Sequence, residues 1–239
     1  MLLDISKPGL GGPNSSNNLG AIAGYAKNSN KDPECPGKVA VNGTGPQVLD
    51  FEPVIWGPKA NEIRQLSVLA GDSVGLALGI NDLGQTVGIS GRCANTVLPG
   101  FTAGPHAVLW DTDGSVHDFG NLGGTVNPAL LAVGNGAIAI NNWGEVTGVS
   151  ALKGNQTFHP FLWTKTTGMQ DLGVLSGDLV GAGLGMNNKG EIVGASISAP
   201  GPASGTPRAF LWRGGVMNDL NALVQQDAPL AFWRCRTMA

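Results

Sequence analysis

A five-residue pattern ending in tryptophan occurs four times in the chain, and this repetition limits the fold more than any other feature. One copy reads His106-Ala107-Val108-Leu109-Trp110, and residues 52–56, 159–163 and 208–212 repeat it with small changes. The tryptophans of this pentad lie 54, 53 and 49 residues apart, at Trp56, Trp110, Trp163 and Trp212. A period near 50 residues is typical of propeller blades and is too long for the rungs of a β-helix.

Two further motifs accompany each pentad. An Asn-x-x-Gly motif precedes it and starts at Asn17, Asn81, Asn141 and Asn187. A second glycine follows after an apolar pair, at Gly24, Gly88, Gly148 and Gly194. A two-residue motif follows each pentad: an Asp or Gln and then a leucine or phenylalanine. Its first residue is Gln65, Asp118, Asp171 or Asp219. We therefore divide a single domain, residues 1–239, into repeats at about 17–66, 75–122, 137–175 and 181–224.

Each repeat predicts four short antiparallel strands. Asparagine suits the first position of a type I turn, and glycine suits the left-handed position that closes a bulged hairpin. The pentad is apolar at successive positions, so both faces of its strand must be covered. Sheets stacked around an axis provide this, and we predict an all-β, propeller-like fold of four four-stranded sheets. Residues 7–16 are rich in Gly, Pro, Ser and Asn and indicate a loop, so the first repeat lacks an obvious first strand.

A glycine in the middle of a strand weakens it unless another group packs over it. The second glycines, Gly24, Gly88, Gly148 and Gly194, recur together with the pentad tryptophans, and an aromatic ring can cover a strand glycine. We therefore expect a tryptophan from the neighbouring strand or sheet over each glycine. This is a packing prediction with no chemistry attached.

Two segments are candidates for closing the four sheets into a ring. The apolar run 229–233 or residues 2–5 would complete the first sheet. If neither does so, the repeats form an arc whose exposed sheet edges favour a homodimer. Of the two arrangements, we favour the closed ring.

The motifs Asn-x-x-Gly, His-Ala-Phe-Leu-Trp and Met-x-Asp-Leu-Gly together resemble the HAF repeat of probable extracellular bacterial proteins. The closest copies are residues 159–163 with 169–173, and 208–212 with 217–220. The resemblance extends over nearly the whole chain and implies secretion or surface display, without an established activity. The first repeat departs from it, because Glu52 and Pro53 replace His-Ala and Gln65 replaces the aspartate.

Composition excludes several classes of partner. Charged residues make up 13% of the chain, the net charge is −3, and no run of Lys or Arg occurs, which argues against nucleic acid. Apolar runs reach only about five or six residues, against the ~20 that a membrane helix needs. No signal peptide is visible at residues 1–4. For the three cysteines, a Cys35–Cys93 bridge is one alternative and free thiols at both positions are the one we favour, with Cys235 also free.

Candidate binding residues lie in the connections. The long ones, 27–50, 92–104, 151–158 and 197–207, follow the second strand of each repeat, and long loops on a rigid scaffold often carry function. Asp72, Asp178 and Thr125 lie in connections between repeats that share this face. The two aspartates either meet at the axis as ligands for Ca²⁺ or a sugar, or are turn residues, which we favour. Trp143 lies in a turn, where an exposed indole can stack on a sugar ring.

The repeated polar residues favour structural roles. His106 and His159 begin the pentad in two copies, where Glu52 and Arg208 stand in the others; a catalytic residue does not recur in every repeat. We expect hydrogen bonds there, and expect the aspartates that follow the pentads to accept backbone N–H groups. The Ser-x-x-Lys pattern of Ser150 and Lys153 needs a helix and here enters a loop.

With no catalytic constellation left over, we favour an extracellular or surface module that binds a small ligand, a glycan or a protein. A secreted hydrolase or lyase acting on an ester or a polysaccharide is the alternative. A structural piece of a longer repeat protein is a third possibility.

Overall fold

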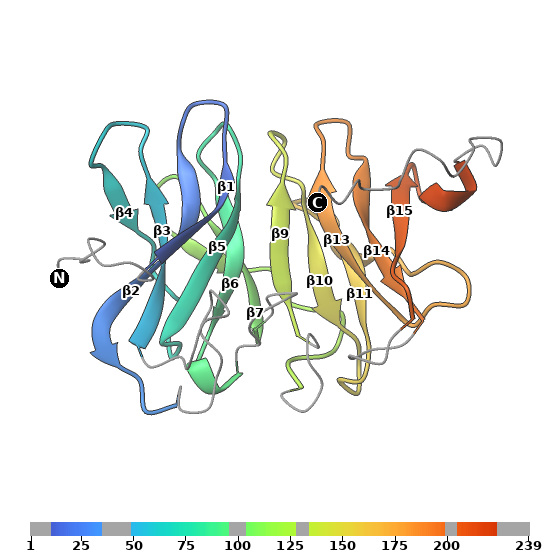
Figure 1. Ribbon diagram of the computed structural model, residues 1–239, viewed down its shortest axis with the longest axis horizontal. Helices are drawn as coiled ribbons and strands as arrows, with labels where there is room; N and C mark the ends of the chain where they lie inside the picture. The colour runs from blue at the N-terminus through green and yellow to red at the C-terminus, as the bar shows by residue number, and fades with distance from the viewer. Residues whose placement is uncertain (1–10, 35–48, 96–103, 128–133, 199–204, 224–239) are drawn as a thin grey trace, which may run out of the picture.

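The computed structural model describes residues 11–34, 49–95, 104–127, 134–198 and 205–223. Over these ranges the chain forms sixteen strands in four four-stranded antiparallel sheets (Figure 1). Short 3₁₀-helices follow β6 and β16, at Cys93–Asn95 and Leu220–Leu223. The all-β, four-sheet prediction is confirmed.

Each sheet is formed by one continuous stretch of chain. Sheet 1 contains β1 (Gly11–Ser16), β2 (Ile22–Lys31), β3 (Leu49–Trp56) and β4 (Ile63–Gln65). Sheet 2 contains β5 (Val74–Ile80), β6 (Thr86–Gly91), β7 (His106–Trp110) and β8 (Val116–Asp118). Sheet 3 contains β9 (Gly136–Ile140), β10 (Val146–Ala151), β11 (Phe158–Thr164) and β12 (Gly168–Asp171). Sheet 4 contains β13 (Val180–Met186), β14 (Ile192–Ile197), β15 (Arg208–Arg213) and β16 (Val216–Asp219).

The first repeat has a first strand after all, so our interpretation of residues 7–16 as a loop was wrong for its second half. Gly11–Ser16 pairs with β2 as β1. This strand lies at a sheet edge and is largely exposed, so it needs few apolar residues, and an edge strand tolerates Pro13. The first place in sheet 1 is therefore filled. Residues 2–5 and 229–233, which we expected to fill it, lie outside the described residues.

Consecutive sheets pack face to face, which explains why the pentad is apolar at successive positions. The core between sheets 1 and 2 joins Ala23 and Ile55 with Val108 and Trp110. The core between sheets 2 and 3 joins Val87 and Leu109 with partners that include Phe161. Sheets 1 and 4 lie at opposite ends of the row, so the four sheets form an open arc and not the closed ring that we favoured (Figure 1).

A β-bulge in the first strand of every sheet explains the second glycine of every repeat. In sheet 2 the register shifts between Ala77 and Gly79, and the Leu76 carbonyl then lies against Gly88 so closely that a Cβ there would overlap it. The same overlap occurs at Gly24, Gly148 and Gly194 with the first-strand carbonyls of Gly12, Gly136 and Ala182.

The expected tryptophan cover is present in sheets 1 and 2, where the rings of Trp56 and Trp110 also lie against the glycine. In sheet 4 the ring against Gly194 belongs to Phe210, and in sheet 3 the nearest atoms to Gly148 are backbone atoms of β9. The backbone carbonyl is thus the partner that all four glycines share, and the tryptophan is not.

The four Asn-x-x-Gly turns form a ladder along one end of the molecule, which we call the hairpin end. Within each turn the asparagine Oδ1 accepts two backbone N–H groups; Asn141, for example, accepts those of Trp143 and Glu145, both at 3.0 Å. Between turns the Nδ2 group donates to the next asparagine's carbonyl oxygen: Asn17 to Asn81 at 3.0 Å, Asn81 to Asn141 at 3.0 Å and Asn141 to Asn187 at 3.2 Å.

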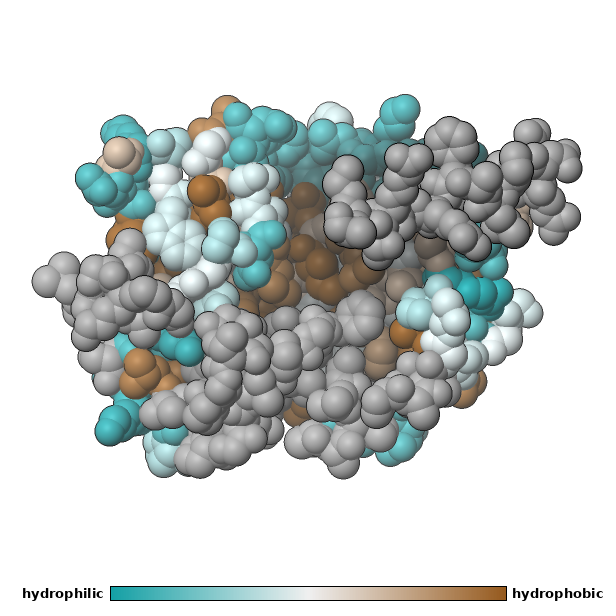
Figure 2. Space-filling model, in the orientation of Figure 1, coloured by the Kyte–Doolittle hydropathy of each residue, from teal (hydrophilic) through white to brown (hydrophobic). Residues whose placement is uncertain are grey.

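The residues that follow these asparagines add a second row to the ladder. The backbone N–H of Asn18 donates to Asp82, that of Asp82 to Asn142, and that of Asn142 to Asn188. Figure 2 shows the hairpin end as a hydrophilic band, with apolar surface below it around β9.

Cys93 is disulfide-bonded, so our preference for a free thiol at this position was wrong. Its neighbour Arg92 forms an ion pair with Glu34, the residue before Cys35. Cys35 and Cys235 lie outside the described residues, and the pairing of Cys93 with Cys35 stays a prediction that this ion pair supports.

Candidate functional site

A pocket of about 860 Å³ opens at the hairpin end between sheets 2 and 3. We call it the indole pocket, because two tryptophans, Trp143 and Trp163, line it together with Phe119. Its polar lining includes Asp111, His117 and Lys165. The volume falls in the range of about 300–1,000 Å³ that is usual for small-molecule sites.

Trp143 is the third residue of the turn between β9 and β10. The residue is 76% exposed, although a residue of this size normally buries most of its surface. The turn fixes its backbone through Asn141, and its indole Nε1 donates to the Asn188 carbonyl oxygen of the next turn at 2.8 Å. The indole is therefore held in place while most of its surface remains open to solvent.

The same turn position holds different residues in the other repeats, Leu19, Leu83 and Lys189. A related but smaller pocket of about 320 Å³ lies between sheets 1 and 2, with Leu83 in the lining. The large aromatic pocket is therefore a property of the third turn, and the repeated scaffold alone does not produce it.

The floor of the indole pocket is apolar. The rings of Phe119 and Trp163 lie with their centroids 4.6 Å apart and their planes tilted by 54°. Both belong to the core between sheets 2 and 3, with Leu109 beside them. Residues that the fold needs for its own packing thus form the base of the site.

The polar rim combines acceptors with donors. Asp111 accepts the N–H of Thr112 at 2.8 Å and lies 3.4 Å from the side-chain amide of Gln85. His117 contacts the Ser115 hydroxyl through Nε2 at 3.0 Å, and Lys165 is exposed. The rim therefore offers both carboxylate oxygens and N–H groups to a ligand that carries hydroxyls.

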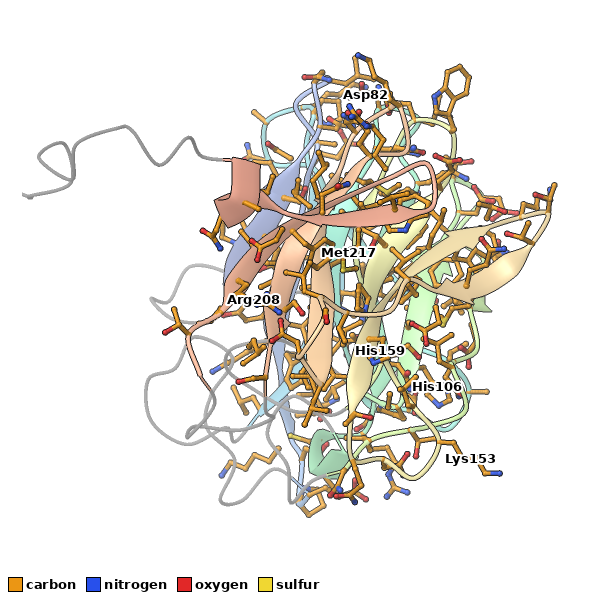
Figure 3. All side chains as sticks on the ribbon, turned by 90° about the vertical axis from the view of Figure 1, so that its right-hand side faces the viewer. Asp82, His106, Lys153, His159, Arg208 and Met217 are labelled. Atoms are coloured by element: carbon orange, nitrogen blue, oxygen red, sulfur yellow. The ribbon has the colours of Figure 1, made fainter. Side chains whose placement is uncertain are left out.

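The first residue of each pentad pairs across the strands with the residue that we noted after the pentad. The pairs are His106–Asp118 at 2.7 Å, His159–Asp171 at 2.8 Å, Arg208–Asp219 at 3.2 Å and Gln65–Glu52 at 2.8 Å. His106, His159 and Arg208 lie on neighbouring sheets, away from Asp82 at the hairpin end (Figure 3). This recurrence supports the structural role that we expected.

The aspartates of these pairs also accept backbone N–H groups, as we expected. Asp118 accepts from Gly120 at 2.8 Å and Asp171 from Gly173 at 2.7 Å. Burial acts to raise the pKa of Asp171, but the hydrogen bonds from His159 and Gly173 outweigh it, and the pKa lies below its ordinary value. This carboxylate therefore stays ionised, and its oxygens are already hydrogen-bonded to His159 and to the backbone at the end of its own strand.

Asp72, Asp178 and Thr125 lie in the connections between sheets, at the end opposite the hairpins. Asp72 accepts the hydroxyl of Ser90 at 2.6 Å, and Asp178 pairs with Arg208 at 2.9 Å. Thr125 donates its backbone N–H to Asn155 at 2.8 Å. None of them lines the indole pocket, and a ligand role for them stays a prediction. Much of the long connections that we expected to hold a site lies outside the described residues.

A repeated serine escaped the sequence interpretation. Ser90, Ser150 and Ser196 follow the second glycine by two residues, and each hydroxyl accepts a leucine N–H from the connection before its sheet, at 3.0, 2.9 and 3.1 Å respectively. The Gly-x-Ser spacing in three repeats was the available signal. Ser150 is buried in β10 and its hydroxyl donates to Asn135, while Lys153 lies exposed in the turn that follows, so the helix that the Ser-x-x-Lys pattern needs is absent at this place.

A second site that the sequence did not reveal lies near the start of β3. Asp50 and Asp32 line a pocket of about 470 Å³ together with Lys31 and Arg92. Burial, and then the hydrogen bond and the negative charge of Asp32, raise the pKa of Asp50 to about 6. The folded chain therefore binds a proton at Asp50 more tightly than the unfolded chain does.

This shift predicts a pH-dependent stability. The pKa of Asp50 is about 6 in the folded chain and about 3.9 in the unfolded one. The stabilisation of the fold by the protonated Asp50 is therefore complete below about pH 4 and is lost as the pH rises through 6. We expect Asp50→Asn to raise the free energy of unfolding by about 1 kcal/mol near pH 7 and to change it little near pH 4.

Urea unfolding of both proteins across this pH range checks the expectation. Asp113→Asn is the control, because hydrogen bonds from Ser115 lower the pKa of Asp113, and its removal should weaken the fold at neutral pH. A wild type whose stability rises with pH relative to Asp50→Asn would contradict the prediction.

Comparison with known proteins gives no relative: no family model, no curated protein and no solved structure matches the chain. Within the described residues, no group of three or more His, Cys, Asp or Glu side chains is placed to hold a metal ion. The same part of the chain contains no helix that is long and apolar enough to cross a membrane.

Proposed function

We propose that the protein is an extracellular or surface binding module whose indole pocket takes a carbohydrate ring. The single observation that carries this proposal is the exposed, hydrogen-bonded Trp143 at the mouth of an aromatic pocket. Of the four Asn-x-x-Gly turns, the third alone has a tryptophan at its third position. The pocket is therefore a feature that the repeated scaffold does not itself require.

The chemistry of the lining supports a sugar. The C–H face of a pyranose is apolar and stacks on an indole, while its hydroxyls need donors and acceptors at the ring edge. Trp143 provides the open ring, and Asp111, His117 and Lys165 provide the polar groups. Because the Trp143 indole is anchored to Asn188, little side-chain freedom is lost on binding.

The extracellular assignment is supported by the disulfide bond of Cys93, since such bonds persist mainly in oxidising compartments. The HAF-like motifs point in the same direction. We propose both the repeat family and the location on these grounds.

A glycan array followed by calorimetry with the best oligosaccharide tests the binding. We expect Trp143→Leu, which installs the residue found at positions 19 and 83, to weaken binding at least tenfold, since a lost stacking contact corresponds to about 1.4 kcal/mol. Leu83→Ala, at the equivalent turn of sheet 2 and also in the pocket lining, is the comparison variant and should change affinity less. Absence of binding across neutral and acidic glycans, with the protein folded, would refute the proposal.

The rival function is a hydrolase or lyase acting at the same pocket. It needs a free acid, whereas Asp118 is already bound to His106 and Gly120, and Asp111 to Thr112. Incubation with the bound oligosaccharide separates the two functions. Recovery of the intact sugar supports the binding module, and cleavage that Asp111→Asn abolishes supports the enzyme.

A further inference from the structure

In sheets 1 to 3, one face packs on the sheet that follows. We call it the leading face and define it by three positions: the residue before the second glycine and the second and fourth residues of the pentad. In sheets 1 to 3 all nine side chains are buried: Ala23, Pro53 and Ile55; Val87, Ala107 and Leu109; Thr147, Pro160 and Leu162. The leading face is thus the surface on which the next sheet docks.

Sheet 4 has the same apolar face with no described sheet after it. Val193 is 45% exposed, Ala209 is exposed and Leu211 is half-buried. These residues pair across the strands as their counterparts do in sheets 2 and 3, Val193 lying opposite Leu211. Figure 3 views the molecule from the side on which sheet 4 lies.

Sheet 1 carries the complementary surface. The opposite face of each sheet, its trailing face, includes the pentad tryptophan and its two cross-strand partners. In sheet 2 Trp110 is fully buried against sheet 1. In sheet 1 Trp56 is only half-buried, and its cross-strand partners Ile22 and Ile63 are 37% and 36% exposed.

The asparagine ladder ends with unmatched donors at one side and unmatched acceptors at the other. Among the described residues, the Nδ2 group of Asn187 at sheet 4 donates only to its own turn, at Glu191, and the backbone N–H of Asn188 has no partner. At sheet 1 the carbonyl oxygen of Asn17 accepts from Gly20 of its own turn and from no other described residue, and the Asn18 Oδ1 has no described donor. These are the donors and acceptors that pair at every internal junction.

We propose that the leading face of sheet 4 docks on the trailing face of sheet 1 of a second copy of this chain. The contact continues the three junctions already present in the molecule, with Val193 and Leu211 against Ile22 and Trp56, and with Asn187 and Asn188 donating to Asn17 and Asn18 of the second copy. It joins sheet faces and not the open sheet edges that the sequence suggested. Because the two surfaces differ, the association is head to tail.

Light scattering coupled to gel filtration tests the association. We expect a mass of at least twice the 24.4 kDa of one chain at micromolar concentration. Val193→Lys buries a charge in the apolar contact, and we expect it to weaken association at least 100-fold. Leu83→Lys places the same charge on an exposed leucine outside both faces and should leave the mass unchanged.

A mixture of two variants tests the polarity of the contact. Ile22→Glu alone should also abolish association, and mixing it with Val193→Lys should restore a complex, because the unaltered leading face of the Ile22→Glu chain then meets the unaltered trailing face of the Val193→Lys chain. A single-chain mass for the wild type at high concentration overturns the proposal. The proposal is also overturned if the wild type is a single chain and its Trp233→Ser variant associates. The segment after residue 223 would then be the occupant of the leading face of sheet 4.

Discussion

Gly88→Ala is expected to lower the free energy of unfolding by about 3 to 4 kcal/mol, or the melting temperature by roughly 10 °C. The added Cβ would overlap the carbonyl of Leu76, which the bulge of β5 places over the glycine, and would also lie 3.0 Å from the ring of Trp110. A carbonyl held in a strand ladder cannot turn away, so β5 must change its register or separate from β6. Thermal and urea unfolding measure the loss.

Gly185→Ala is the matched control for this substitution. Gly185 also lies in the first strand of its sheet, but a Cβ there meets only a Val193 methyl group at the ordinary distance of 3.4 Å. We expect a change within about 0.5 kcal/mol, because the new methyl group fits and the unfolded chain loses freedom. Equal effects of the two substitutions would mean that backbone overlap is not the reason for the repeated glycine.

Asn141→Ala is expected to lower the free energy of unfolding by about 3 kcal/mol. This buried side chain accepts two N–H groups of its own turn and donates to Glu145 and to the Asn187 carbonyl of the next sheet. Its removal leaves buried polar groups without partners, which costs more than the hydrogen bonds themselves contribute.

Asn187→Ala separates the turn from the ladder. Asn187 makes the same bonds within its turn, but it is exposed and donates to no later described sheet of its own chain. Both variants are compared in the Val193→Lys background, where the proposed contact with a second copy is absent. We expect a loss of about 1 kcal/mol, so that the difference between the two variants measures the inter-sheet bond and its burial. A loss at Asn187 as large as that at Asn141 would show that the ladder contributes nothing.

The repeat length, the strand count and the turn type were predictable from the sequence because they depend on local chemistry. The Asn-x-x-Gly turn is fixed by the bonds that asparagine Oδ1 makes to its own backbone, and the positive φ of Gly84 and Gly144 requires glycine. The pentad's unbroken apolar pattern indicated stacked sheets, and the cores on both faces of β7 confirm it.

Other features depended on contacts between distant residues and gave little local signal. The strand at Gly11–Ser16 needs only backbone bonds to β2, so its composition suggested a loop. The bulges over the second glycines shift one residue in the first strand without changing the apolar pattern. The elevated pKa of Asp50 arises because Asp32 lies beside it, although eighteen positions separate the two in the chain.

The candidate site was predictable only in part. Trp143 was recognisable because a turn position held a large aromatic residue, but the floor of its pocket was not. Phe119 and Trp163 occupy repeated positions, for which the sequence predicted a packing role. They line a cavity because of the way sheets 2 and 3 are spaced, which the sequence did not indicate. Asp72 and Asp178 looked equivalent in sequence, yet Asp72 is held by Ser90 and Asp178 by Arg208.

Because each sheet is a continuous stretch of chain whose described strands pack only on the sheets before and after it, the architecture can grow by duplication. A copied stretch of about fifty residues brings its own leading face, trailing face and ladder asparagine, and it fits between any two existing sheets without a new kind of interface. Selection can then alter a single turn residue, as at Trp143, in one copy while the others maintain the framework.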